Sequence, residues 1–274
     1  MSKVLKGLLY ALLIILSILS IFPFWILFVN ATRASDQITQ VFSLMPSNFL
    51  FKNFDSLLSQ GFDVYSGFRN SIFISTTTTI LSLYFSALTA YGFKVYNFKF
   101  KRYLYVVIIL SILIPPQLSI IGFYQLMVKM GLTNSYIPLI VPMIAAPATV
   151  FFFRQYLDSI LHKELIEAAR IDGANELYVF HKIVMPLIQP ALATMGIFTF
   201  VVSWNDFFTP LMIITSKSKY TLPMLIALLR GEVYMVDYGA MYLGLSLSVI
   251  PLIIIYMLFS KYIIDGTTLG SVKG

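Results

Sequence analysis

Six long stretches without a charged residue constrain this chain more than any other feature of its sequence. A helix needs about 20 mainly apolar residues to cross the roughly 30 Å hydrocarbon core of a bilayer, and each stretch is long enough. Because backbone groups in lipid must be satisfied within one segment or a closed barrel, the stretches are expected to be helices. The predicted spans are approximately residues 7–29, 71–93, 103–126, 136–154, 187–213 and 239–260. We therefore predict an all-α polytopic membrane protein, with residues 1–274 forming one transmembrane domain.

Composition supports this prediction. Hydrophobic residues make up 58% of the chain and charged residues 11%, whereas a soluble domain has about a quarter of its residues charged. The first stretch is longer than the apolar region of a cleaved signal peptide, which indicates a retained span. The third span contains Pro115-Pro116, and proline kinks a helix because it lacks a backbone donor.

The net charge of +7 is spread between the apolar stretches. No basic face or stacking surface accompanies it, so nucleic-acid binding is not expected. With a cytoplasmic N-terminus, twelve of the 19 lysines and arginines fall on the inner side, four of them in the short loop Lys94–Arg102. Basic residues in short loops favour the cytoplasmic side. We therefore predict that both termini are cytoplasmic.

Several chemistries have no support in the sequence. The chain has no cysteine and only two histidines, His162 and His181, which argues against disulfides and metal centres. It has no Gly-x-x-x-x-Gly-Lys-[Ser/Thr] nucleotide motif, paired carboxylates or catalytic triad. We predict no catalytic residue, no metal site, no cofactor bound by this chain, and no enzymatic activity of its own.

The inner segment between the fourth and fifth spans, residues 157–186, is the most informative. It predicts a short helix over about Glu164–Ile171, ended by Gly173 in the left-handed conformation that closes helices. Asn175 is then expected to cap a second short helix that Pro186 ends. A helix this short is marginal alone and needs a surface to lie on.

The spacing of this segment resembles a known family. Three residues separate Glu167-Ala168-Ala169 from Gly173, and nine residues separate Gly173 from Ile183. Met185-Pro186 follows Ile183 after one further residue. The pattern resembles the EAA loop of bacterial ABC-importer permeases, with Met185 where leucine is usual. The run EAARIDGA, together with Trp204-Asn205-Asp206-Phe207 and Gly270–Gly274, resembles the carbohydrate branch of that family. Within this branch, the chain resembles the second of two paired permease subunits.

The resemblance implies half of the translocation pathway of an ATP-driven sugar importer in the bacterial inner membrane. The loop would be a coupling helix in a groove of a separate ATPase, acting through Glu164, Glu167, Ala168, Ala169, Asp172, Gly173 and Pro186. The implied partners are a second permease subunit in a heterodimer, two cytoplasmic ABC ATPase subunits that use ATP and Mg²⁺, an extracytoplasmic sugar-binding protein, and membrane lipid. An ordinary solvated loop helix, with Glu167 a surface charge, is the alternative.

Two further features leave alternatives open. Asp206 interrupts an apolar stretch beside Trp204 and Asn205, and these residues either lie at the outer interface or form a gate of the pathway. Residues 215–238 resemble the outer loop that meets a substrate-binding protein, and the tail 270–274 either reaches the ATPase or is a frayed terminus. An ion-coupled secondary transporter is the alternative function, although it would predict internal repeats and mid-span charges that are not found.

Overall fold

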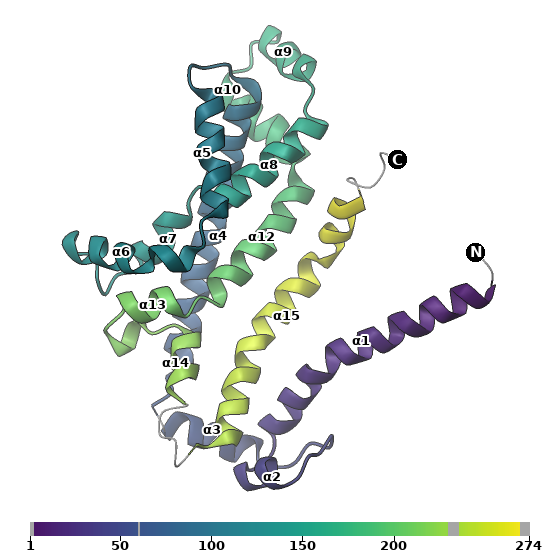
Figure 1. Ribbon diagram of the computed structural model, residues 1–274, viewed down its shortest axis with the longest axis vertical. Helices are drawn as coiled ribbons and strands as arrows, with labels where there is room; N and C mark the ends of the chain where they lie inside the picture. Colours follow the sequence, from purple (N-terminus) through teal and green to yellow (C-terminus); the bar gives the residue numbers. More distant parts are fainter. Residues whose placement is uncertain (1–2, 60, 230–235, 269–274) are drawn as a thin grey trace. The chain divides into compact units, whose positions relative to one another are not determined.

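The computed structural model describes residues 3–59, 61–229 and 236–268, and this part of the chain contains helices and no strand (Figure 1). The predicted all-α class is therefore confirmed. The tail motif at 270–274 and residues 230–235 of the outer segment lie outside the described residues. The longer helices are α1 (Lys3–Ala31), α3 (Leu50–Ser59), α4 (Val64–Val95), α5 (Lys101–Leu113), α6 (Pro116–Lys129), α8 (Pro147–Ile160), α9 (Lys163–Ile171), α12 (Gln189–Trp204) and α15 (Tyr238–Thr268).

Short elements connect these helices. They are α2 (Ser35–Gln40), α7 (Ile137–Ile140), the 3₁₀-helix η1 (Val141–Met143), α10 (Glu176–Tyr178), the π-helix η2 (Val179–Val184), α11 (Met185–Leu187), α13 (Phe208–Ile213), the 3₁₀-helix η3 (Lys217–Lys219) and α14 (Leu222–Leu228).

The described ranges contain four helical segments that are individually long and apolar enough to cross a membrane: Lys3–Ala31, Val64–Val95, Ile137–Ile160 and Tyr238–Ser260. Two bent helix pairs, Lys101–Leu113 with Gln117–Lys129 and Glu176–Leu187 with Gln189–Trp204, would raise the number to six if each were one span. The first pair is bent by 105°, where Pro115-Pro116 predicted a kink. The chain is a multi-pass membrane protein.

Two compact units form within the chain, and each is described by itself. The first comprises residues 1–65 and 222–252. Hydrogen bonds to polar groups organise it: Asn53 Nδ2 donates to the backbone oxygens of Ala31 and Arg33, at 2.8 and 2.9 Å. Ser35 and Ser56 donate to the Asp237 carboxylate, whose Oδ1 also accepts the amide N–H of Ala240 at the start of α15.

Asp237 lies outside the predicted spans. Its burial acts to raise its pKa, but the hydrogen bonds from Ser56, Ser35 and the amides of Ala240 and Gly239 outweigh that effect and hold the pKa below its ordinary value. The folded state of this unit therefore favours the ionised carboxylate.

The second unit, residues 66–221 and 253–274, holds one continuous hydrophobic core. Small side chains of α4, Ala87 and Ala90, face Phe153 of α8 and Phe180 of η2 in this core. Ile166 and Ala169 of α9 belong to the same core. Consequently α9 is packed onto the helices that cross the membrane instead of standing free in solvent.

The expectation that Pro186 ends the second short helix is wrong. The π-helix η2 precedes this proline, and the amide of Met185 bonds to the carbonyl of Phe180, five residues back. A widened π-turn shifts the backbone partners by one residue and leaves room for the proline ring. The helix therefore continues through α11, and the chain turns by 79° at Ile188 before α12.

Candidate functional site

The candidate site is centred on α9, which lies at the end of the second unit, beyond α8 (Figure 1). Its C-terminus closes as the sequence predicted: Gly173 has a φ of +83°, and its amide donates to the carbonyl of Arg170 at 3.0 Å. A left-handed residue here lets the chain reverse direction without the steric cost that a Cβ imposes. Asn175 Oδ1 accepts the amide N–H of Tyr178 at 2.8 Å, which confirms the predicted cap.

The two faces of α9 differ sharply. Ile166 and Ala169 are 3% and 8% exposed and anchor the helix to the core. The other predicted coupling residues are all exposed: Glu164, Glu167, Ala168, Asp172, Gly173 and Pro186. Ala169 is thus an anchor on the inner face, whereas its neighbour Ala168 is available on the outer face.

Large apolar side chains surround the exposed face. Ile171 is 86% exposed, Leu177 64%, Tyr178 54% and Leu165 43%. Glu167 and Lys94 line a hollow of about 180 Å³. Asp172, Gly173 and Tyr178 line another of about 430 Å³. Pro186 lines neither hollow. Four large apolar side chains exposed on one short inner segment are consistent with an interaction site. None of these apolar residues was among the coupling residues predicted from the sequence, although their position in the short inner segment was a signal for them.

A polar cluster fixes the end of α9. Nε and Nη2 of Arg170 each lie 2.8 Å from Glu176 Oε1, and the Tyr91 hydroxyl donates to Glu176 Oε2 at 2.9 Å. The Arg170 guanidinium also lies 5.8 Å from the ring centre of Tyr96. A hydrogen bond from Tyr96, together with those from Tyr91 and Arg170, lowers the pKa of Glu176. Because Tyr91 belongs to α4, the cluster ties the α9–α10 turn to that long helix.

The three residues proposed for a gate lie in different environments. Trp204 is 1% exposed and stacks on Phe200, with ring centroids 5.6 Å apart, so its ring belongs to the protein interior. Asn205 is exposed at the end of α12. Asp206 lies in the break before α13, where its Oδ1 accepts the amide N–H of Thr209 at 3.2 Å.

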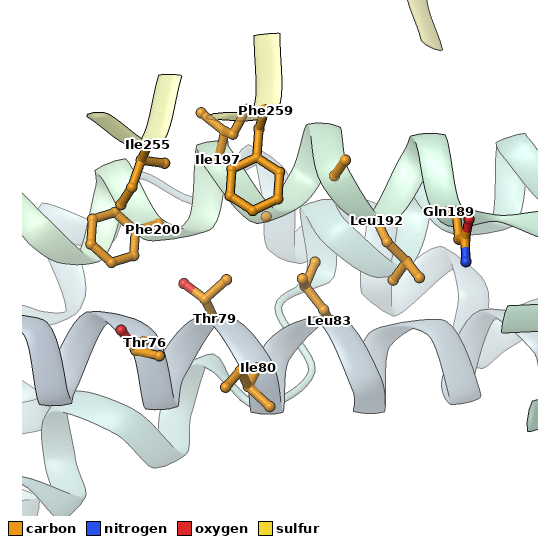
Figure 2. A pocket seen from close by; sticks show the side chains of 12 residues that line it. Thr76, Thr79, Ile80, Leu83, Gln189, Leu192, Ile197, Phe200, Ile255 and Phe259 are labelled. Atoms are coloured by element: carbon orange, nitrogen blue, oxygen red, sulfur yellow. The ribbon is translucent and has the colours of Figure 1, made fainter. Parts of the chain in front are cut away.

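Two larger cavities differ in chemistry. One of about 570 Å³ lies between α4, α12 and the second part of α15 (Figure 2), and apart from Thr76, Thr79 and Gln189 its lining is apolar. The other, of about 490 Å³, brings Asp206 and Thr209 together with Gln117 and Ser119 of α6. The rest of this lining is apolar, as in the first cavity, and the difference between the two is the Asp206 carboxylate, which can pair with a polar solute.

A multi-pass helical bundle that anchors a short, exposed helix at one end has the architecture of a membrane transport subunit. Comparison with known sequences makes this specific. The chain belongs to the family of binding-protein-dependent transport system inner membrane components, whose pattern matches residues 82–268. The family resemblance drawn from the EAA spacing is thereby confirmed, and the family favours binding-protein-dependent transport over an ion-coupled transporter.

Related proteins cover nearly the whole chain. The arabinooligosaccharides transport system permease protein AraQ of Halalkalibacterium halodurans is 36% identical over 278 residues, covering 100% of this chain and 98% of that protein. AraQ of Bacillus subtilis is 34% identical, covering 94% and 92%. The lactose transport system permease protein LacG of Rhizobium radiobacter is 31% identical, covering 96% and 95%.

The fold also matches a solved structure. A chain from the crystal structure of a bacterial ABC transporter involved in the import of the acidic polysaccharide alginate superposes with a TM-score of 0.82 at 22% identity. The match covers 96% of this chain and 99% of that one. This likeness supports the fold of the transmembrane bundle.

Proposed function

We propose that this chain is a permease subunit of an ATP-driven sugar importer in the bacterial inner membrane, and that α9 couples it to a separate ATPase. The observation that carries the coupling role is the two-sided character of α9. Ile166 and Ala169 hold one face in the transmembrane core, while Glu167 and Ala168 lie exposed on the other. Relatives named as permeases for arabinooligosaccharides and lactose support a sugar as the cargo.

The attachment of α9 to the bundle allows it to transmit movement. A helix that is seated in a groove of a moving partner transmits displacement only if its other face is fixed to the bundle. The core contacts of Ile166 and Ala169, and the cluster of Arg170, Glu176 and Tyr91, supply that fixation. The exposed Ile171 and Leu177 supply apolar area that a partner would cover, and removing apolar area from water favours association.

The complete transporter in this proposal contains a second permease subunit in a heterodimer, two cytoplasmic ABC ATPase subunits and an extracytoplasmic sugar-binding protein. Both termini of this chain are cytoplasmic. ATP and Mg²⁺ are bound and used by the ATPase, and this chain binds no cofactor and performs no hydrolysis. The subunits alternate between an inward-facing and an outward-facing state. Each ligand shifts the equilibrium between these two states only by the difference in its affinity for them. The cavity containing Asp206 is the candidate place for the polar solute within this half of the pathway.

The experiment is reconstitution of the chain with its second permease, ATPase and binding protein, followed by measurement of ATP-dependent uptake and of ATPase co-purification. Glu167→Gln is expected to lower both while membrane insertion stays normal. Asp36→Asn is the matched control, since Asp36 is an exposed acid in the outer segment. Unchanged uptake and unchanged co-purification for Glu167→Gln and for Gly173→Ala would remove the coupling role.

A further inference from the structure

A further cavity with distinctive chemistry lies at the start of α5, and no residue of α9 lines it. Its volume is about 440 Å³. Three cations line it, Lys101, Arg102 and Arg154, together with aromatic rings that include Phe100, Tyr103 and Tyr105. No acidic side chain lines it. The whole cavity belongs to the second unit.

Arg154 of α8 has unused donor capacity at this place. Its guanidinium lies 3.5 Å from the ring centre of Tyr105, which fixes its plane. Its Nε and Nη1 atoms are buried and have no hydrogen-bond acceptor among the described residues. The carboxylate of Asp158 is 3.8 Å from Nε and also pairs with Lys94 at 3.0 Å. Because this one carboxylate is shared between two cations and is closer to Lys94, the positive charge of Arg154 is only partly neutralised.

Positive charge accumulates around the same cavity. Lys101 donates to the backbone oxygen of Tyr96 at 2.8 Å. Burial lowers the pKa of Lys101 most, and the positive charge of Arg154 lowers it further. Asp158 opposes this shift, and Lys163 and Lys94 each add a smaller lowering. The N-terminal end of α5 adds the positive end of the helix dipole. An anion in the cavity would relieve this repulsion.

The residues around the cavity have the composition of a membrane interface. Phe98, Phe100 and Tyr103 are 41%, 60% and 72% exposed, as in the aromatic belts at membrane interfaces. Lys101 opens α5, whose next residues run into the apolar third span. The loop 94–102 is predicted to be cytoplasmic, where anionic lipids create a negative surface potential.

We propose that this cavity binds the phosphate of an anionic phospholipid in the cytoplasmic leaflet. Lys101, Arg102 and Arg154 supply the positive charge that holds the phosphate, and the exposed rings border the acyl chains. A zwitterionic lipid fits less well because its own ammonium group meets the same three cations. The proposal depends on the membrane orientation of the chain and not on its cargo or its ATPase, so the two sets of proposals fail separately.

The experiment uses native mass spectrometry of the full-length chain in its assembled transporter, released from membranes that contain phosphatidylglycerol or only phosphatidylcholine. Arg154→Gln and Lys101→Gln each remove one lining cation. The matched control is Lys99→Gln, which removes the same charge from the same loop without lining the cavity. A partly exposed ion pair contributes up to about 1 kcal/mol, which corresponds to roughly fivefold in affinity, and only a cation that lines the cavity can pair with the bound phosphate.

We expect the retained phosphatidylglycerol to fall about fivefold in Arg154→Gln and in Lys101→Gln and to stay near wild type in Lys99→Gln. Phosphatidylcholine retention should be unaffected in all three variants. Equal retention in all three variants would overturn the proposal. Displacement of the lipid by millimolar inorganic phosphate would identify a soluble anion site and overturn the lipid assignment. If Arg154→Gln fails to insert, Lys101→Gln against Lys99→Gln decides the question.

Discussion

Replacing Glu176 with alanine should loosen α9 without touching its exposed face. The change removes the carboxylate that accepts from Nε and Nη2 of Arg170 and from the hydroxyl of Tyr91. These contacts are the polar link between the end of α9 and the long helix α4. Ile166 and Ala169 stay packed in the core, so the helix should remain folded but open more often.

The expected magnitude follows from exposure. The side chains of Arg170 and Glu176 are 40% and 41% exposed, so solvent screening limits their ion pair to about 0.5–1 kcal/mol. The hydrogen bond from the partly buried Tyr91 hydroxyl to a charged acceptor adds about 1–1.5 kcal/mol. The local free energy of opening should therefore fall by about 2 kcal/mol, which is roughly a 30-fold change in the opening equilibrium.

Hydrogen exchange measures this opening directly. In the permease without its ATPase, backbone amides of residues 163–176 should exchange about 10- to 70-fold faster in Glu176→Ala, which corresponds to a loss of about 1.5–2.5 kcal/mol. Amides of α8 should be unchanged. Glu167→Ala is the matched control, because Glu167 is exposed on the same helix and its loss should alter exchange by less than about threefold. Equal exchange in wild type and Glu176→Ala would refute the reasoning.

Three further changes have predictable results. Gly173→Ala forces a left-handed alanine with open space around its Cβ, so it should cost about 1–2 kcal/mol, seen as faster exchange after α9. Gly239→Ala would place a Cβ 2.5 Å from Asn53 Oδ1 and should lower the thermal unfolding midpoint, whereas Gly92→Ala, with nothing within 4 Å, should not. The lowered pKa of Asp237 means that its stabilisation is present above the ordinary pKa of aspartate and is lost as pH falls through the lowered value. The midpoint difference between wild type and Asp237→Asn should therefore shrink on acidification, and a constant difference would contradict this assignment.

Local chemistry made much of the site predictable from sequence. Gly173 and Asn175 act at helix ends through their own backbone and side-chain geometry, so the sequence alone indicated both. Apolar length likewise predicted α4 and α15 as long helices. The effect of Pro186 was not predictable, because its tolerance depends on the π-turn in front of it.

Contacts between residues far apart in the sequence could not be predicted from the sequence. Tyr91 and Glu176 are 85 positions apart, and no local pattern pairs them. The helical period alone also did not show that Ala169 is buried while Ala168 is exposed, since that depends on where the core of α4 and η2 lies. The break between Trp204 and Phe208 likewise contains a hydrogen bond, from the Thr209 amide to Asp206 Oδ1, that no sequence pattern indicated.

The most direct test of the coupling role uses the absence of cysteine from this chain. A single Ala168→Cys variant, labelled with a thiol-directed photocrosslinker in the assembled transporter, should form an adduct with the ATPase subunit. The matched Asp36→Cys variant should not. Failure of Ala168→Cys to reach any ATPase at every stage of turnover would contradict the proposal that α9 links this chain to its motor.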